Sequence, residues 1–252
     1  MAFSEGRLDI FYRPVVDPRD EQVMIYRAVP VLTSDEGVVK VGAKQVLKHH
    51  GKPTDPAATI NTAERNVAVL QRAAADLVAA HSAGRAVFLM MPISANSLGT
   101  KESATVMVKA LKEMHPLCAK AIISHLFDLP DRVTLDVLDD VVVPLLISID
   151  KFVIEPPDGL KDYADIGACN AQGVVLDMDP DEGSGLDLTT LWTRAAPRHL
   201  GIFVQNVADE DVIPALVRFE GRGVDGPVLG KLLPEIGPRT TRGSLASLET
   251  VP

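Results

Sequence analysis

Residues Asp9–Val31, DIFYRPVVDPRDEQVMIYRAVPV, decide the fold. Two apolar runs, Asp9–Val16 and Val23–Val31, flank a connection of six residues, Asp17–Gln22, that begins Asp-Pro-Arg-Asp. The runs are rich in Val and Ile and are bounded by Pro and Asp, as buried strands usually are. A parallel crossover needs about a dozen residues or more, so this short connection predicts an antiparallel hairpin.

Six more short apolar runs follow this hairpin, and we expect each to be a strand: Ala86–Ile93, Lys120–Phe127, Pro144–Ile149, Gly173–Asp177, His199–Val207 and Pro227–Leu233. Segments with helical spacing of apolar residues lie between most of them: Thr62–His81, Ser103–Met114, Asp131–Val143, Leu188–Ala196 and Asp209–Arg222. Alternating strands and helices indicate a mostly parallel sheet. Eight strands therefore predict an α/β fold, a TIM-like (β/α)8 barrel with an antiparallel first strand. We assign residues 1–236 to this barrel and predict a disordered polar tail over 237–252.

The composition excludes several classes of protein. A net charge of -9 and a pI near 5.1 argue against nucleic-acid binding and against capture by an anionic membrane. No run reaches the roughly 20 apolar residues that a membrane-spanning helix needs, and the polar start lacks the apolar core of a signal peptide. The two cysteines, Cys118 and Cys169, form no metal or redox motif. We therefore expect a cytoplasmic protein.

Several segments together resemble one family. They are FYRPVVD at Phe11–Asp17, IYRAV at Ile25–Val29, ISANSL at Ile93–Leu98, and the stretch from Leu200 to Pro234 with its glycines. Their order and spacing are similar to those of EAL domains, the cyclic-di-GMP phosphodiesterases, over roughly Arg7 to Pro234. The fold that this resemblance implies is the same barrel, with its first strand antiparallel.

The resemblance also implies where chemistry would take place. EAL domains cleave one phosphodiester bond with two divalent metals, which need hard oxygen ligands. By resemblance, Arg27 stands where the signature Glu is found, and Pro92 replaces a metal-binding Asn. A ligand Glu falls at Ser124 or His125, and a pair of aspartates becomes Asp150 and Lys151. The catalytic Lys falls at Val175, a later Glu at Gln205, and the Gln of the last strand at Asp225.

This substitution pattern predicts a pseudo-phosphodiesterase that uses no metal and no other cofactor. We expect a regulatory or scaffold protein of bacterial signalling that acts through contacts with an unidentified protein partner. A non-hydrolysing cyclic-di-GMP receptor is the alternative, and an active phosphodiesterase is the third reading. The resemblance leaves a homodimer open as well.

Two interpretations of the altered site compete. Arg27 and Lys151 would together form an anion-binding site, because a guanidinium grips phosphate with two hydrogen bonds. Alternatively, Arg27 pairs with Asp150, and the charges neutralise one another. We favour the internal ion pair, because the Arg that helps to hold the dinucleotide in the family falls at Val31 here.

The acidic run at residues 177–183 resembles a calcium loop. It has Glu182 where such a loop has Gly, and Leu188 where the final Glu belongs. We therefore expect a solvated loop there.

Overall fold

Eight strands close into a barrel in the computed structural model, which describes residues 2–3, 6–48, 56–179, 181, 183, 185 and 187–245. Each strand is hydrogen-bonded to two neighbours, and pairing between the first two strands of the barrel completes the ring. In chain order the strands are β2 (Gly6–Val16), β3 (Gln22–Thr33), β5 (Phe88–Ser94), β6 (Ile122–Phe127), β7 (Phe152–Ile154), β8 (Gly173–Asp177), β9 (Gly201–Gln205) and β10 (Gly223–Val224).

Strand β2 runs antiparallel to both of its neighbours in the ring, β3 and β10, while the other strands run parallel. Its long hairpin with β3 aligns Arg13 with Arg27, and a hydrogen bond from the Asp17 amide to the Gln22 carbonyl closes the turn. The predicted fold class and the predicted hairpin are thus confirmed.

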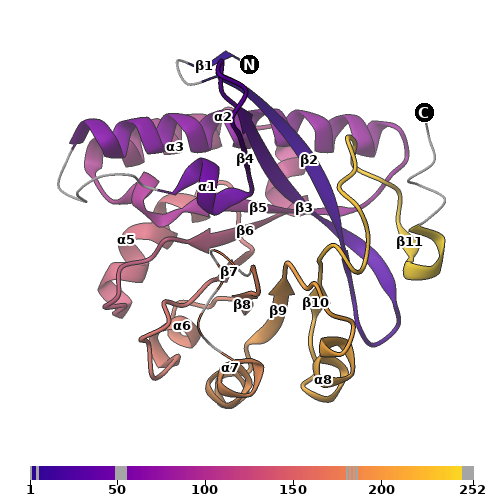
Figure 1. The fold of residues 1–252 in the computed structure, drawn as a ribbon. Coiled ribbons are helices and arrows are strands. Elements are labelled where there is room, and N and C mark those ends of the chain that lie inside the picture. Colours follow the sequence, from indigo (N-terminus) through magenta and orange to yellow (C-terminus); the bar gives the residue numbers. More distant parts are fainter. Residues whose placement is uncertain are drawn as a thin grey trace.

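Helices surround the barrel (Figure 1). They are α1 (Ala43–Leu47), α2 (Pro56–Ser82), α3 (Lys101–Lys112), α4 (Pro116–Ala121), α5 (Leu135–Leu146), α6 (Ala164–Ala168), α7 (Leu188–Ala195) and α8 (Val212–Arg218). Several of these helices begin at a residue whose side chain caps the first turn. Such a cap accepts a hydrogen bond from a backbone amide that has no partner within the helix. Thr100, Thr134 and Asp187 each accept a hydrogen bond from the backbone three residues on.

The shorter elements extend the barrel. Strands β1 (Ala2–Phe3) and β4 (Val39–Val41) pair with β2 and β3, and β11 (Thr240–Thr241) pairs with the start of β3. The 3-10 turns are η1 (Ala95–Leu98), η2 (Ala196–Arg198) and η3 (Arg242–Ser244). The tail predicted to be disordered from residue 237 is therefore structured up to the buried Leu245. Its polar residues do not prevent this, since the Tyr26 hydroxyl donates to the Pro238 carbonyl. Residues 246–252 lie outside the described part.

Two of the predicted strands are wrong. Much of the run Pro144–Ile149 belongs to α5, where Leu145 faces the core, and the strand of this unit is β7 at Phe152–Ile154. The run Pro227–Leu233 is a turn that ends in a single bridge from Leu233 to Tyr12, and the last strand of the barrel is β10. Short apolar runs do not distinguish a buried strand from the buried face of a helix.

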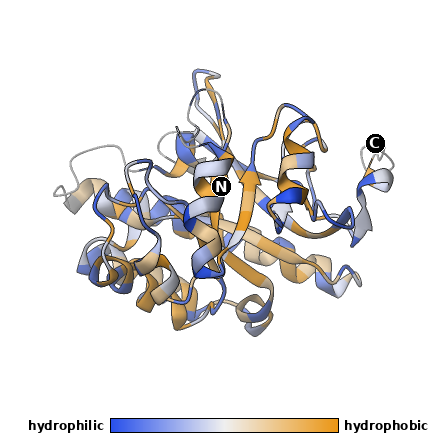
Figure 2. Cartoon of the chain, turned by 90° about the horizontal axis from the view of Figure 1, so that it is seen from below, coloured by the Kyte–Doolittle hydropathy of each residue, from blue (hydrophilic) through white to orange (hydrophobic). Residues whose placement is uncertain are grey.

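Two apolar layers hold the fold together, one between barrel and helices and one inside the barrel. The inner layer contains one side chain from each of five consecutive strands: Met90, Ile123, Val153, Val175 and Phe203. Figure 2 shows apolar residues along the central strands and more polar ones on the helices around them. Because side chains alternate along a strand, the residue two positions after each inner-layer residue also points inward, nearer the carboxyl ends of the strands.

Candidate functional site

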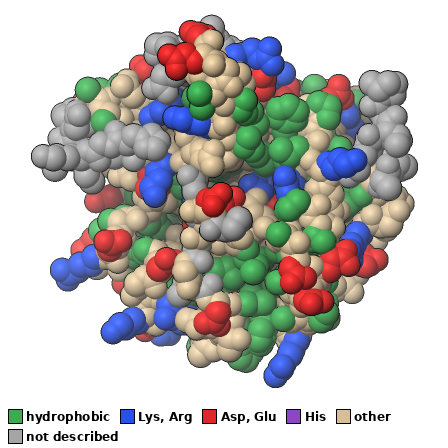
Figure 3. Space-filling view, in the orientation of Figure 1, with side chains coloured by type: hydrophobic (Ala, Val, Ile, Leu, Met, Phe, Trp, Pro, Cys, Tyr) green, Lys and Arg blue, Asp and Glu red, His purple; other side chains and the backbone are tan. Residues whose placement is uncertain are grey.

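Charged side chains gather at the carboxyl ends of the parallel strands, which we call the mouth. A cavity of about 380 Å³ opens there, and Figure 3 shows acidic and basic side chains around the hollow on this face. Its lining includes Arg27, His125, Glu155, Asp177 and Gln205. Apart from Arg27, each lies two positions after a residue of the inner apolar layer, so strand alternation explains why four of the five point into the mouth.

Arg27 forms a buried ion pair with Asp225. Its Nε lies 2.7 Å from Oδ2 of Asp225, and its second terminal nitrogen lies 2.6 Å from Oδ1. Arg27 is 4% exposed and Asp225 is 1% exposed. Burial by itself lowers the pKa of Arg27, but Asp225 outweighs it and the pKa is raised, so the guanidinium stays charged. This two-pronged contact is the strong form of a charge-assisted hydrogen bond.

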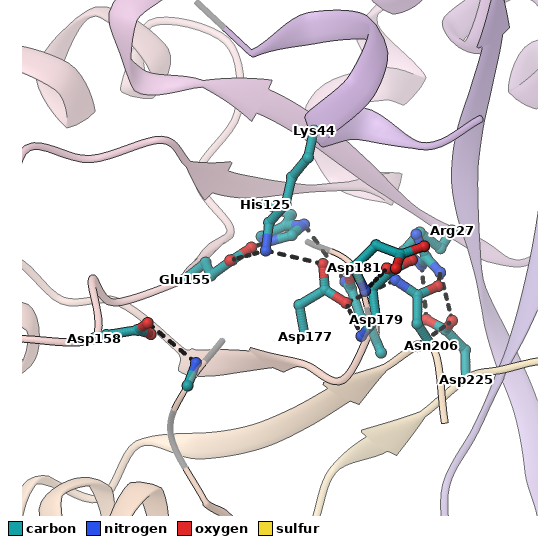
Figure 4. A network of polar contacts seen from close by, with 12 residues as sticks. Arg27, Lys44, His125, Glu155, Asp158, Asp177, Asp179, Asp181, Asn206 and Asp225 are labelled. Carbon is teal, nitrogen blue, oxygen red and sulfur yellow. Dashed lines mark hydrogen bonds and ion pairs between the residues drawn. The ribbon is translucent and has the colours of Figure 1, made fainter. Parts of the chain in front are cut away.

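Asn206 joins this ion pair to a second acid. Its Oδ1 accepts from Arg27 at 2.9 Å, and its Nδ2 donates to Oδ1 of Asp177 at 2.7 Å. Asn206 directly follows β9 and has a φ of 59°, a left-handed conformation that asparagine tolerates better than most residues. This backbone turn places its amide between Arg27 on β3 and Asp177 at the end of β8, as Figure 4 shows.

Lys44 enters the mouth from α1 and contacts two carboxylates. Its Nζ lies 2.7 Å from Oε1 of Glu155 and 3.1 Å from Oδ2 of Asp177 (Figure 4). Burial alone would lower the pKa of Lys44, but the two acids outweigh it and the pKa is raised. Burial alone would raise the pKa of Asp177, but Lys44, Asn206 and the Asp179 amide outweigh it and the pKa is lowered. Both groups are thus held in their charged forms.

His125 and Gln205 extend the network on the other side of Glu155. Nε2 of His125 lies 3.4 Å from Oε2 of Glu155, and its Nδ1 lies 3.4 Å from the amide nitrogen of Gln205. The Gln205 amide also reaches the Met90 sulfur, at 3.4 Å. The two contacts of His125 are long for hydrogen bonds, so this side of the mouth is held less firmly than the Arg27 side.

Arg13 is the third basic residue at the mouth. It lies opposite Arg27 in the β2–β3 pairing and lines the same cavity. Its Nε is buried and has no hydrogen-bond partner within the described residues. Burial lowers the pKa of Arg13, Asp225 opposes this effect, and Arg27 adds to it. Arg13 therefore presents a guanidinium to the cavity that the internal network does not fully use.

The structure brings some of the predicted site residues together. Arg27, Gln205 and Asp225 meet at the mouth. Of the two alternatives on β6, His125 lines the cavity, whereas Ser124 takes the opposite face of the strand. Pro92 shares the inward face of β5 with Met90, and Val175 lies in the apolar layer beneath the mouth.

Asp150 and Lys151 do not join this group. They precede β7, at the amino ends of the parallel strands, whereas the mouth lies at the carboxyl ends. Lys151 pairs there with Asp150 at 3.0 Å and donates to the Lys120 carbonyl at 3.2 Å. The predicted Arg27–Asp150 ion pair is therefore wrong, and so is the placement of Lys151 beside Arg27. Both errors follow from taking Pro144–Ile149 as the strand, which would put Asp150 and Lys151 just after its carboxyl end. The strand is β7 at Phe152–Ile154, so the acid that follows it at the mouth is Glu155.

Sequence reasoning missed four residues of the mouth: Arg13, Lys44, Glu155 and Asn206. Glu155 directly follows the apolar triplet Phe152–Ile154, and an acid after a buried strand was a readable signal. Lys44 carries no such signal, because it lies on a five-residue helix. Asp177, predicted to belong to a solvated loop, instead contacts Lys44 and Asn206. Residues 180 and 182 of that loop lie outside the described part.

Solved structures share this fold at low sequence identity. No protein-family model matches the sequence, and no curated protein matches it. The phosphodiesterase PaMucR in complex with c-di-GMP is 17% identical, with a TM-score of 0.70 over 90% of this chain and 92% of that one. The EAL domain of Mycobacterium smegmatis DcpA is 16% identical, with a TM-score of 0.59 over 98% and 100%. The FimX EAL domain of Xanthomonas citri, in complex with c-di-GMP, is 15% identical, with a TM-score of 0.62 over 92% and 88%.

These matches show that the chain has the fold of EAL domains. Nearly complete coverage in both directions means that the likeness involves the whole barrel rather than a shared unit. At sequence identities this low, the matches establish the fold and no shared function. Among the described residues, no helix is both long and apolar enough to cross a membrane.

Proposed function

We propose that this chain is a catalytically inactive EAL-type domain that acts in bacterial signalling through contacts with another protein. The observation that carries the proposal is the pairing of carboxylates with cations at the mouth. Asp225 is bound by Arg27, while Glu155 and Asp177 are both bound by Lys44. The acids that would have to bind metal are thus engaged by the protein's own positive charges.

The residues at the mouth do not fit two divalent cations. Metal hydrolysis of a phosphodiester requires several oxygen ligands that are free to bind. A metal would here have to displace the Lys44 ammonium and lie near the buried Arg27 guanidinium, and each positive charge would repel it. No three His, Cys, Asp or Glu side chains in the described ranges form a group that could hold a metal ion.

A hydrolysis assay tests the proposal directly. Purified protein is incubated with cyclic-di-GMP and millimolar Mg²⁺ or Mn²⁺, and the linear dinucleotide is measured by chromatography, with PaMucR as the positive control. We expect no product above the protein-free blank. Turnover that the Asp177→Asn variant abolishes would overturn the proposal, because it would assign the product to this mouth rather than to a contaminant.

A receptor that binds cyclic-di-GMP without cleaving it is the second candidate. The observation in its favour is Arg13, whose buried Nε lacks a partner beside a cavity of about 380 Å³. A guanidinium is well suited to a phosphate, and two of the similar structures, PaMucR and the FimX domain, hold c-di-GMP. The two candidates share the lack of turnover and differ only in binding.

Calorimetry with an Arg13→Ala variant separates the two candidates. Under the leading proposal, cyclic-di-GMP gives no binding heat with the wild type or with the variant. Micromolar binding that weakens at least about tenfold in Arg13→Ala, the loss of one charged hydrogen bond, would support the receptor instead. Arg19→Ala is the matched control, because Arg19 lies in the same hairpin but pairs with Asp17 at the surface.

A further inference from the structure

The outer face of α5 combines exposed acids with exposed apolar side chains. Its first half carries Asp136, Asp139 and Asp140, and its second half, with the residue after it, carries Val143, Leu146 and Ile147. At 100° per residue all six lie within about 120° of the helix circumference. The opposite side carries the buried residues Leu138, Val141, Val142 and Leu145. The helix packs against α3 and α6 at the rim of the barrel (Figure 1).

The apolar half is unusually exposed for three aliphatic residues in one place. Val143, Leu146 and Ile147 are 58%, 48% and 51% exposed. Single exposed aliphatic residues need no explanation, but a contiguous group rimmed by polar residues marks an interaction site. Covering them would remove apolar area from water, at about 25 cal/mol for each Å².

The acidic half of this face has no cationic partner within the part of the chain that the structure describes. Asp136, Asp139 and Asp140 are exposed, and none of them pairs with a cation of the described residues. Asp136 and Asp140 are four positions apart, so the three carboxylates span only about 6 Å along the helix axis. A cation brought from outside would relieve their mutual repulsion. A partner that docks here would therefore need positive charge opposite this half.

A second copy of this chain does not complement the face. A twofold axis perpendicular to α5 would bring two copies of the helix together antiparallel, which places the acids of one copy on Val143 and Ile147 of the other. A twofold axis along α5 would place acid on acid. The first arrangement desolvates carboxylates without pairing them, and the second adds repulsion. An anionic lipid surface is disfavoured by the same charges.

We propose that the outer face of α5 docks an amphipathic helix of a partner protein. The partner's Lys or Arg side chains lie against Asp136, Asp139 and Asp140, and its apolar side chains cover Val143, Leu146 and Ile147. Laying an amphipathic helix on an apolar stripe is a common mode of recognition. The inference deepens the proposed function by stating the chemistry of the partner, and it places the contact away from the mouth.

The test uses the full chain, labelled with ¹⁵N, and a synthetic 18-residue amphipathic helix of Leu and Lys as the probe. We expect changes in the amide chemical shifts that are confined to α5. We also expect the Lys peptide to bind at least tenfold more tightly than the same peptide with Glu in place of Lys. Asp139→Lys/Asp140→Lys should reverse this preference, and Val143→Ser/Ile147→Ser should weaken both peptides. The matched control is Glu64→Lys, which replaces an exposed acid on α2. It should change neither the preference between the two peptides nor the affinity for them.

Several outcomes would overturn the inference. Equal binding of the two peptides, shift changes spread over the surface, or an unchanged preference in the double lysine variant would each refute a partner of this charge. Sedimentation supplies a second measurement: a dimer that Val143→Ser/Ile147→Ser dissociates would assign the face to a second copy. These readouts are independent of turnover. A positive hydrolysis assay would therefore end the proposed function and leave the inference about α5 standing.

Discussion

Replacing Arg27 with methionine is expected to lower the free energy of unfolding by about 3–5 kcal/mol, the cost of leaving a buried charge without its partner. Methionine keeps much of the volume of the side chain but removes both hydrogen bonds to Asp225. Asp225 is 1% exposed, so water cannot replace them. The Asn206 amide loses one contact as well. Urea unfolding, followed by circular dichroism, measures the loss.

A double variant shows whether charge is the cause. In Arg27→Met/Asp225→Asn the buried acid is gone, so we expect much of the lost stability to return, with a coupling energy of about 2–3 kcal/mol. Arg19→Met is the matched control: it breaks an exposed pair with Asp17 and should cost less than about 1 kcal/mol. A loss below about 1 kcal/mol in Arg27→Met would mean that the mouth rearranges or admits water.

The fold could be predicted because its decisive features are local. The connection of six residues between two strongly apolar strands leaves no room for a crossover, which settles the direction of β2. The wrong strand predictions arose where the apolar pattern of the sequence fits a strand and a helix equally well. Pro144–Ile149 is apolar because the end of α5 and the residues after it bury Leu145 and Ile149 and expose Leu146 and Ile147. Tertiary contacts, which no local pattern contains, decide between strand and helix there.

The site was predicted only where strand register alone determines it. Gln205 and Asp225 lie at or just after strand ends, Arg27 lies midway along β3, and the barrel brings these positions together. The partner of Arg27 was wrong, because whether Asp150 or Asp225 faces it depends on where β7 begins. Lys44 could not have been found, since it reaches the mouth from a short helix between β4 and α2. The distinguishing property of this mouth, carboxylates neutralised from within, therefore became visible only in three dimensions.

Replacing Lys44 with methionine is expected to make stability rise as the pH falls from 7 to 5, a range in which the stability of the wild type changes little. In the wild type, the lowered pKa of Asp177 adds stability at neutral pH that is lost as the pH falls through the carboxylate range, about 4 and below. The raised pKa of Lys44 adds stability that is lost only as the pH rises above about 10. Between these limits the wild type should change little.

In Lys44→Met, Glu155 and Asp177 remain nearly buried, with side chains 11% and 8% exposed, and face each other without a cation. The folded variant then binds a proton at the mouth more readily than the unfolded chain does, so its stability rises as the pH falls from 7 to 5. At pH 7 it should be about 3 kcal/mol less stable than the wild type, the lower end of the cost of breaking a buried pair. Urea unfolding between pH 5 and 8 measures both effects.

Two further variants make this result specific to the ion pair. Lys48→Met removes an exposed lysine just after α1 and should leave the pH profile of the wild type intact. Lys44→Met/Glu155→Gln removes the Lys44 ammonium and also the repulsion between Glu155 and Asp177. This double variant should therefore be more stable than Lys44→Met at pH 7, and its stability should not rise as the pH falls to 5. If Lys44→Met instead follows the wild-type profile, Glu155 and Asp177 do not depend on Lys44 for their charge. The mouth would then have two acids free to bind an added cation, and the main argument against metal hydrolysis would fail.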